Sequence, residues 1–469
     1  MKRLHPLVWF ACAFTVACAG DAGTGATPVE SVPALTIALP NGAVAATVGS
    51  ALSYDATRGG EVCSNPAGGA ITYTITFSGP SNGLSATGGR VTGTPTTTGV
   101  VDATLTATDR LGRTVTDAFA IAAFAPGLPA PVLPTVPAAY DDASLPLPAH
   151  FLANIGGGSV LGTDNTPASN PTTNAGATLG RVLFYDTRLS ANDGTSCASC
   201  HIQSLGFADT AVKSVGFAGG LTGRHASALG NARFYRRGRF FWDERAATLE
   251  AQVVTPIQDA TEMGMRLDAL VRKLSATTYY APLFTAAFGS PTVTDERIAR
   301  ALAQYVRALR STGSRYDRAF AGGGQPDFSG FTAQERQGEQ VFRTAGCARC
   351  HTGVAQVSDD VHNTGLDATI TDVGAGNGAF KAPSLRNVAL RGRFMHDGRF
   401  TSLQQVVGFY DSGVQPNPGL DPRLRAPDGT PLRLRLTAGD RAALVAFMGT
   451  LTDSTLIAAP RFSNPFPAH

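Results

Sequence analysis

The chain reads Cys197-Ala-Ser-Cys200-His201 at one point and Cys347-Ala-Arg-Cys350-His351 at another. A Cys-x-x-Cys-His sequence is typical of a c-type haem attachment site, where two thiols bind the porphyrin and the histidine ligates the iron. A thioredoxin-type redox pair would not need a histidine after each second cysteine, and a zinc site would need four ligands close together. The sequence therefore predicts two covalent haems, attached through Cys197, Cys200, Cys347 and Cys350, with His201 and His351 as iron ligands.

The remaining cysteines do not form a disulfide framework. Of the seven cysteines, four belong to the two motifs, and Cys12 and Cys18 lie in the N-terminal leader. Only Cys63 is left in the mature chain, without a cysteine partner. We therefore expect Cys63 to be a buried or inert thiol.

The N-terminus is typical of an export signal. Lys2 and Arg3 precede a short apolar run from Leu7 to Ala19. The end of this run resembles a lipoprotein cleavage box with Cys18 as the lipidated residue, and ordinary cleavage near Ala19 is the alternative. No later segment is apolar for long enough to span a bilayer. We expect a periplasmic or cell-envelope protein that is soluble or attached to the membrane only through a lipid on Cys18.

Length and composition indicate several domains. A chain of 469 residues corresponds to about three domains. A net charge of +3 with 16% charged residues gives no indication of a nucleic-acid partner. Gly, Thr, Ala and Pro are abundant before residue 175, and Arg and Phe become frequent after it. We expect a signal peptide over 1–19, an Ig-like β-sandwich over 35–125, a linker over 126–175, and cytochrome c-like domains over 176–325 and 326–469.

Alternation of apolar and polar residues predicts strands in the N-terminal part. Residues 71–77 alternate Ile, Tyr, Ile and Phe with threonine, and residues 103–108 alternate Ala and Leu with threonine. The run Gly83-Leu84, Val91-Thr92-Gly93-Thr94-Pro95-Thr96, Gly99 and Ala107-Thr108-Asp109 resembles the bacterial cadherin-like Ig repeat, whose members act as spacers or adhesion units. Calcium could bind to the carboxylates of Asp102, Asp109 and Asp117. We expect instead that these residues lie in solvent at the ends of strands.

The remainder of the chain is predicted to be mainly helical. Helices are expected to begin at Thr294, at Thr332, where Glu335 completes a capping box, and at Thr437, which opens the last helix. The fold class is therefore multidomain: an N-terminal all-β Ig-like sandwich followed by two mainly α cytochrome c-like haem domains.

Longer motifs surround the two attachment sequences. They are Leu179-Gly180-Arg181-x-Leu183-Phe184-x-Asp186-x-Arg188-Leu189-Ser190, Phe241-Trp242-Asp243-x-Arg245-Ala246, Glu262-Met263-Gly264, Pro383-Ser384-Leu385-Arg386-Asn387 and His396-Asp397-Gly398. With these motifs, residues 140 to 457 resemble the bacterial dihaem cytochrome c peroxidases, including the MauG-like branch. The resemblance implies that the first haem meets peroxide and that the second handles electrons.

The resemblance also assigns roles to side chains. It implies that Trp242 relays electrons between the haems, that Glu262 moves the peroxide proton, and that Gln252 donates a hydrogen bond to bound peroxide. Without the resemblance, Trp242 would be interpreted as a core residue, Glu262 as a charged residue on the surface of a helix, and Gln252 as a surface residue. His362 and His396 are expected to be structural groups rather than iron ligands.

Three positions differ from the peroxidases that need reductive activation. Phe217 stands where their first haem has a capping histidine, which implies an open iron; His225, the nearest downstream histidine, stays an alternative ligand. His225 also stands where the family has the asparagine of a calcium site, so calcium is left open. Tyr410 replaces the axial methionine of the second haem, as in MauG-like members, with Met395 and Met448 as alternatives.

Together these features predict an exported dihaem c-type peroxidase with an N-terminal spacer. Its partners would be hydrogen peroxide and a small redox protein that donates electrons. The first alternative is MauG-like oxidation of a partner protein through a bis-ferryl state. A non-catalytic electron-transfer cytochrome and a surface adhesion protein are alternatives of other classes.

Overall fold

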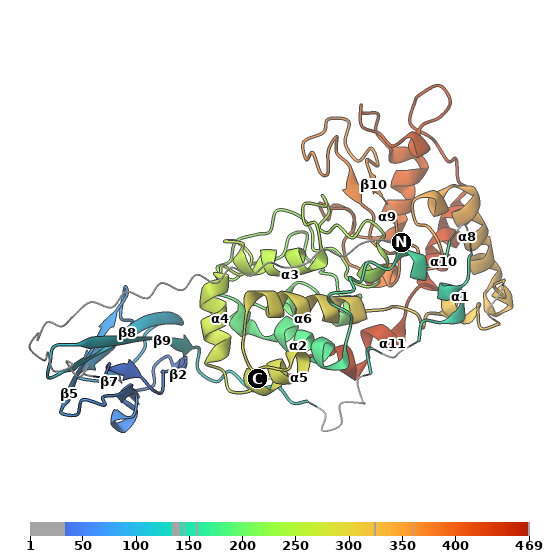
Figure 1. Cartoon of the computed structure of the whole chain (residues 1–469). Helices are drawn as coiled ribbons and strands as arrows, with labels where there is room; N and C mark the ends of the chain where they lie inside the picture. The colour runs from blue at the N-terminus through green and yellow to red at the C-terminus, as the bar shows by residue number, and fades with distance from the viewer. Residues whose placement is uncertain are drawn as a thin grey trace, which may run out of the picture.

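The computed structural model describes residues 33–133, 141–143, 146–155, 158–322, 325–358 and 360–467. The predicted leader, with Cys12 and Cys18, lies outside the described residues. A β-rich N-terminal module lies at one end of a larger, mainly helical part (Figure 1). Within the described ranges, no helix has both the length and the apolar character needed to cross a membrane.

Two main sheets build the β-module, which we define as residues 33–124. Its strands are β1 (Thr36–Ile37), β2 (Val44–Thr47), β3 (Leu52–Asp55), β4 (Cys63–Ser64), β5 (Ile71–Phe77), β6 (Leu84–Thr87), β7 (Arg90–Gly93), β8 (Gly99–Asp109) and β9 (Thr114–Phe124). The larger sheet has the order β2-β9-β8-β5, with β2 parallel to β9, and the smaller has the order β3-β7-β6. Apolar side chains of both sheets share one core, at whose edge Cys63 is buried as predicted.

The side chains of β5 alternate as the sequence predicted, with half-buried apolar residues between exposed threonines. The three aspartates considered for calcium lie in separate environments. Asp117 accepts hydrogen bonds from Asn41 at 2.7 and 2.8 Å, Asp109 bonds to its own turn, and Asp102 pairs with Arg272 of the helical part. The expectation of solvated strand ends is wrong for Asp109 and Asp117, because internal hydrogen bonds satisfy both carboxylates and allow their burial.

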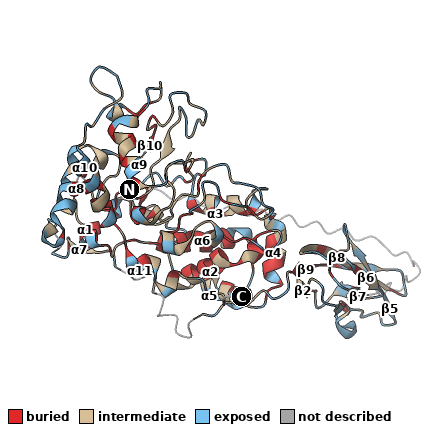
Figure 2. Cartoon of the chain, turned by 180° about the vertical axis from the view of Figure 1, so that it is seen from behind, coloured by how far each residue is buried: buried red, intermediate tan, exposed pale blue. Residues whose placement is uncertain are grey.

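Two halves of similar build make up the helical part. The helices are α1 (Ala149–Leu152), α2 (Asn174–Tyr185), α3 (Leu249–Gln258), α4 (Leu267–Ser275), α5 (Tyr280–Phe288), α6 (Asp295–Ala308), α7 (Arg315–Arg318), α8 (Ala333–Thr344), α9 (Leu403–Gly408), α10 (Ala438–Gly449) and α11 (Ser454–Ile457). The first half contains α2 to α6 and the second contains α8 to α10. Each half has its own apolar core, and most residues of α2 and α6 are buried (Figure 2).

A glycine lies at the central helix crossing of each half. A Cβ on Gly180 of α2 would stand 2.0 Å from the carbonyl oxygen of Ala301 in α6. A Cβ on Gly338 of α8 would stand 1.9 Å from the carbonyl oxygen of Ala443 in α10. Both crossings therefore bring helix backbones into direct contact, which only glycine permits. The shared glycine at the helix crossing indicates that the helical part contains an internal duplication.

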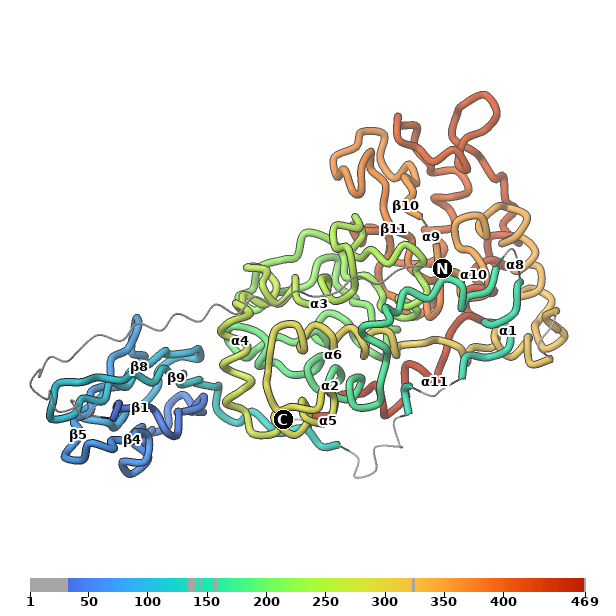
Figure 3. The backbone as a smooth tube through the Cα atoms, in the orientation of Figure 1, coloured from blue at the N-terminus to red at the C-terminus, as the bar shows by residue number. Residues whose placement is uncertain are grey.

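The predicted helix starts are confirmed, because Thr294, Thr332 and Thr437 are the N-caps of α6, α8 and α10. The expectation that the helix after Thr437 is the last one is wrong, since α11 follows it. After α11 the chain returns to the first half (Figure 3), where the hydroxyl of Tyr305 donates to the carbonyl of Phe462 at 2.9 Å. The C-terminal segment thus fastens the second half to the first.

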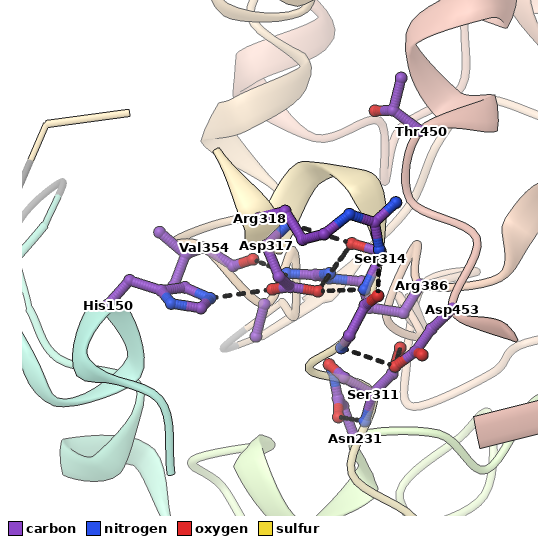
Figure 4. Close-up of polar contacts among 12 residues, drawn as sticks. His150, Asn231, Ser311, Ser314, Asp317, Arg318, Val354, Arg386, Thr450 and Asp453 are labelled. Atoms are coloured by element: carbon purple, nitrogen blue, oxygen red, sulfur yellow. Dashed lines mark hydrogen bonds and ion pairs between the residues drawn. The ribbon is translucent and has the colours of Figure 1, made fainter. Parts of the chain in front are cut away.

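A buried polar network joins the two halves (Figure 4). Arg386, whose side chain is 0% exposed, forms a bidentate ion pair with Asp317 of α7. Asp317 also bonds His150 of α1 at 2.9 Å, and Arg386 donates to the carbonyl of Val354, three residues beyond the second motif. Burial alone would raise the pKa of the Asp317 carboxyl, but Arg386, His150 and Ser314 bring it well below its usual range.

The glycine at the second crossing provides a test of this fold. Gly338→Ala should lower the free energy of unfolding by about 1–3 kcal/mol, because the added methyl group overpacks the contact between α8 and α10. Gly449→Ala in α10 is the matched control, since a Cβ there meets no atom within 4 Å. Thermal unfolding of the haem-loaded protein measures both. Equal unfolding temperatures for the two variants would show that the crossing is not tight.

Candidate functional site

The first motif forms a short turn that presents its three functional side chains together. Cys197–Ser199 is a 3-10 turn capped by Ser196, and the amide of His201 donates to the carbonyl of Cys197 at 3.0 Å. The Nδ1 atom of His201 lies 3.2 Å from the carbonyl oxygen of Phe207. When Nδ1–H donates to this carbonyl, Nε2 is free to ligate a metal. Burial lowers the pKa of His201, which favours the neutral imidazole that a metal requires.

The second motif repeats this geometry around a large cavity. Cys347–Arg349 is again a 3-10 turn, and the amide of His351 donates to the carbonyl of Cys347 at 3.0 Å. The cavity has a volume of about 230 Å³, and its walls include Cys347, Cys350 and His351. Burial lowers the pKa of His351 to about 4.

Both motifs fit a c-type haem. Each holds two thiols and a neutral imidazole on one turn, which is the donor set that covalent haem needs. Among the described residues, the buried Nδ1 atom of His351 has no hydrogen-bond partner. The cavity beside it is lined mainly by apolar side chains, among them Phe394, Leu444 and Met448, as suits a porphyrin.

Glu262 acts on the first motif through its charge. Its charge acts on both Cys197 and Cys200, whose pKa values it helps to raise after the larger effect of burial. The Glu262 carboxyl is itself half-buried, and burial, with the nearby Asp259, raises its pKa. A carboxyl of this kind keeps a proton more readily than an exposed one, so it can exchange a proton with a neighbouring ligand.

Phe217 packs against the segment that carries Glu262. The amide of Phe217 donates to the carbonyl of Glu262 at 2.9 Å, and a Cβ on Gly264 would stand 2.4 Å from the Phe217 ring. The phenyl ring has no ligating atom. Gln252 lies on α3, half-buried, and its side chain makes no hydrogen bond with any residue that the structure describes.

The internal duplication identifies a residue that the sequence reasoning missed. Pro256 is the eighth residue after Thr248, the N-cap of α3, and Tyr410 is the eighth after Ser402, the N-cap of α9. The turns before these helices also match, since Phe241 and Met395 both have positive φ, at 68° and 71°. Pro256 therefore occupies in the first half the position of Tyr410 in the second. The signal was available in the repeated spacing of the two caps.

Trp242 lies at the junction of the halves. It belongs to the first half but lines the cavity of the second motif. Its Nε1–H donates to the carbonyl of His225 at 2.7 Å, and its carbonyl accepts from the amide of Lys381 in β11 (Phe380–Lys381) at 2.8 Å. His225 lines the same cavity, and its Nδ1 lies 2.9 Å from the carbonyl oxygen of Ala211.

Three candidate axial ligands border the second cavity. Tyr410, Met395 and Met448 all line it together with His351. Tyr410 stands in a π-helical turn, Phe409–Gly413, that directly follows α9, and such turns frequently occur at functional sites. Burial raises the pKa of the Tyr410 phenol above its usual value.

The two other histidines considered for ligation have partners of their own. His362, in β10 (Val361–His362), lies between Asp421 at 2.7 Å and Ser358 at 2.9 Å. His396 stacks on Phe380 with ring centroids 3.6 Å apart. These contacts support the structural role that the sequence analysis expected for both.

Comparisons with known proteins agree with this arrangement. The model of the di-haem cytochrome c peroxidase family matches residues 174–325. The methylamine utilization protein MauG of Methylorubrum extorquens is 36% identical over 297 residues, which are 61% of this chain and 80% of that protein. The cytochrome c551 peroxidase of Nitrosomonas europaea is 31% identical over 49% of this chain and 71% of its own length.

A solved structure shares the architecture. A MauG-like protein associated with microbial copper homeostasis superposes with a TM-score of 0.56 at 33% identity, over 64% of this chain and 96% of that one. With two attachment motifs on a duplicated helical scaffold, the chain belongs to the di-haem cytochrome c peroxidase and MauG family of oxidoreductases.

Proposed function

We propose that this protein is an exported dihaem peroxidase that reduces hydrogen peroxide in its first half with electrons passed through its second half. The observation that carries the proposal is the contrast between Pro256 and Tyr410. The first half has a non-ligating side chain at the position where the second half has a phenol. Haem held by the two motifs would supply the redox chemistry, and Pro256 offers no ligating atom that would compete with peroxide in the first half.

Glu262 is the proton-transfer group of this proposal. Peroxide cleavage requires a proton to move from one oxygen atom to the other. The raised pKa of Glu262 and the effect of its charge on the first motif suit this task. Gln252, on the helix that also carries Pro256, would donate a hydrogen bond to peroxide with its free amide group.

Trp242 is the electron relay. Its indole lines the second cavity, while its own chain segment belongs to the first half. The hydrogen bonds to His225 and from Lys381 fix the ring and its backbone at this junction. Because the ring of His225 lines the cavity of the second motif, His225 is not assigned as a ligand in the first half. It also requires no calcium ion.

Oxidation of a partner protein is the second candidate function, and Tyr410 favours it. A phenolate ligand donates charge and favours oxidised iron, whereas a thioether favours the reduced form. A second half ligated by Tyr410 would store oxidising equivalents better than it accepts electrons from a small redox protein. A purely electron-carrying cytochrome is less well supported, because it has no use for Glu262.

The domain assignment follows from the same proposal. It comprises a signal peptide over 1–19, an Ig-like module over 35–125, a linker over 126–175 and haem domains over 176–325 and 326–469. Part of the proposed linker makes tertiary contacts, since Asp164 pairs with Arg233 and His150 with Asp317. Export to the periplasm or cell envelope rests on the leader sequence, with a lipid on Cys18 as the alternative to a free mature protein.

Covalent attachment gives the first test. Because four thiols lie in two complete motifs, the double variant Cys347→Ala with Cys350→Ala should keep about half of the haem that the wild type keeps. Haem-stained denaturing gels after acid-acetone extraction measure this. A wild-type band that disappears on extraction would refute covalent binding.

The peroxide reaction tests the catalytic residues. The oxidised wild type should react with hydrogen peroxide without prior reduction, and stopped-flow absorption separates the two haem signals. Glu262→Gln should slow this reaction about 10²- to 10⁴-fold, because the proton carrier is lost. Trp242→Phe should leave the peroxide reaction intact and slow electron delivery from the second haem.

Glu296→Gln is the matched control for the glutamate change, since its side chain is 75% exposed and lies on α6. It should behave like the wild type. If Glu262→Gln and Trp242→Phe also turn over like the wild type, the assignment of both residues is wrong.

Spectroscopy of the second haem distinguishes the two candidate functions. If Tyr410 is the ligand, Tyr410→Phe should raise the reduction potential of that haem by about 0.1 V or more, because the charge donated by the phenolate is removed. Tyr73→Phe in the β-module is the control and should change nothing. A Met–iron charge-transfer band present in both the wild type and Tyr410→Phe would assign the ligand to methionine and favour the peroxidase.

A further inference from the structure

The β-module is packed against the first half rather than suspended beside it (Figure 1). Phe124, the last residue of β9, is buried in a small apolar cluster with Ala276, which directly follows α4. The hydroxyl of Thr98 donates to the carbonyl of Ala191 at 3.1 Å. Apolar packing and a hydrogen bond thus join the module to α4 and to the loop Ser190–Asp193.

A buried ion pair lies at the centre of this contact. Lys273 of α4 pairs with Asp193, and both side chains are 0% exposed. The second oxygen of the Asp193 carboxylate accepts the amide of Ala125 at 2.8 Å, at the exit of the β-module. The ammonium of Lys273 also faces the ring of Phe124, at 5.7 Å from its centroid. The module therefore completes the environment of a charge pair that belongs to the haem-binding part.

The backbone of Asp193 shows that the loop is held under constraint. Its φ is +59°, in the left-handed region that a residue other than glycine occupies only with local support. Support comes from Lys273 and from the amide of Ala125. Loss of either contact would leave a buried carboxylate partly unpaired, which is costly in a medium without water.

The same loop touches the proposed catalytic segment. The amide of Ala191 donates to the carbonyl of Met263 at 2.8 Å, and the side-chain amide of Asn192 donates to the carbonyl of Phe217 at 2.8 Å. Phe217 in turn donates its amide to the carbonyl of Glu262. A continuous set of contacts therefore leads from β9 through Ser190–Asp193 to the residues on either side of Glu262.

We infer that the β-module is a fixed part of the first half that positions the Ser190–Asp193 loop, and through it Glu262. Asp193 and Lys273 are the positioning residues, and Phe124 and Thr98 are the module's contribution. The role of Glu262 in this inference rests on the proposed function. The structural coupling of the β-module to the Ser190–Asp193 loop rests on the contacts alone. It gives the module a role in the chemistry of the first haem beyond that of a spacer.

Hydrogen exchange and peroxide kinetics on the full-length, haem-loaded protein test this coupling. Phe124→Ala changes only the module, and Lys273→Met changes only the haem-binding part. Both should speed exchange at the amides of Ala191 and Phe217 by about tenfold or more, because the loop opens more often. Both should also slow the reaction of the first haem with peroxide, while the reduction potential of the second haem stays unchanged.

Two further variants separate positioning from general loss of stability. Glu296→Gln removes one side of an exposed ion pair on α6, leaves the contacts between α4 and the module in place, and should match the wild type. Adding Asp193→Asn to Lys273→Met removes the unpaired charge and should restore part of the exchange protection. A lack of rescue, together with faster exchange throughout the first half, would assign Lys273 to stability only and overturn the inference.

The decisive contrary result concerns the module side. If Phe124→Ala speeds exchange at Ala125 but leaves Ala191 and Phe217 unchanged, the module is not coupled to the loop. Hydrogen exchange does not depend on catalysis. If the wild type fails to react with peroxide, the proposed function is refuted, but the exchange measurement still tests the coupling.

Discussion

The buried ion pair between Arg386 and Asp317 is the constraint that ties α7, where the chain leaves the first half, to the segment beyond the second attachment motif. It gathers α1, α7 and the backbone beyond the second attachment motif around one carboxylate. The carboxylate accepts from Arg386, His150 and Ser314, and both terminal nitrogens of Arg386 donate, so the cost of removing the two charges from water is offset only while these partners stay in place. Removal of one partner would leave the other charge buried alone, at a cost of about 3–5 kcal/mol. The cavity of the second motif is thus tied to the chain that leaves the first half.

The two halves share a helical scaffold, and they differ in the side chain at the position of a possible iron ligand. Gly180 and Gly338 make equivalent close crossings, and the two Cys-x-x-Cys-His turns have the same hydrogen bond from histidine to cysteine. Against this common background, Pro256 and Tyr410 stand at equivalent places after equivalent caps. A non-ligating side chain in one half and a phenol in the other would make the two haem sites differ in whether a second protein ligand is at hand. The proposed roles of Glu262 and Trp242 both depend on that asymmetry.

Local signals were sufficient for much of the fold. The attachment turns, the N-caps Thr294, Thr332 and Thr437, and the alternating strand β5 depend on neighbouring residues, so their spacing predicted them. Predictions that needed distant partners were less successful. Asp117 was expected in water, and nothing local indicated that the distant Asn41 would bond to it. Asp109 was also expected in water, although its partners, the amides of Leu111 and Arg113, are local. Pro256 was missed although the repeated spacing after the N-caps Thr248 and Ser402 contained the signal.

The sequence by itself determined that this chain carries two haem attachment turns on a helical scaffold behind a β-rich module, because covalent attachment and capping are encoded within a few residues. Only the tertiary structure decided which groups share an environment. It placed the carbonyl of Glu262 against the amide of Phe217, Trp242 on the wall of the second cavity, and the β-module against the Ser190–Asp193 loop. The reason is physical: burial, charge pairing and backbone contact between segments far apart in the chain depend on how the segments pack, and no local pattern records that packing.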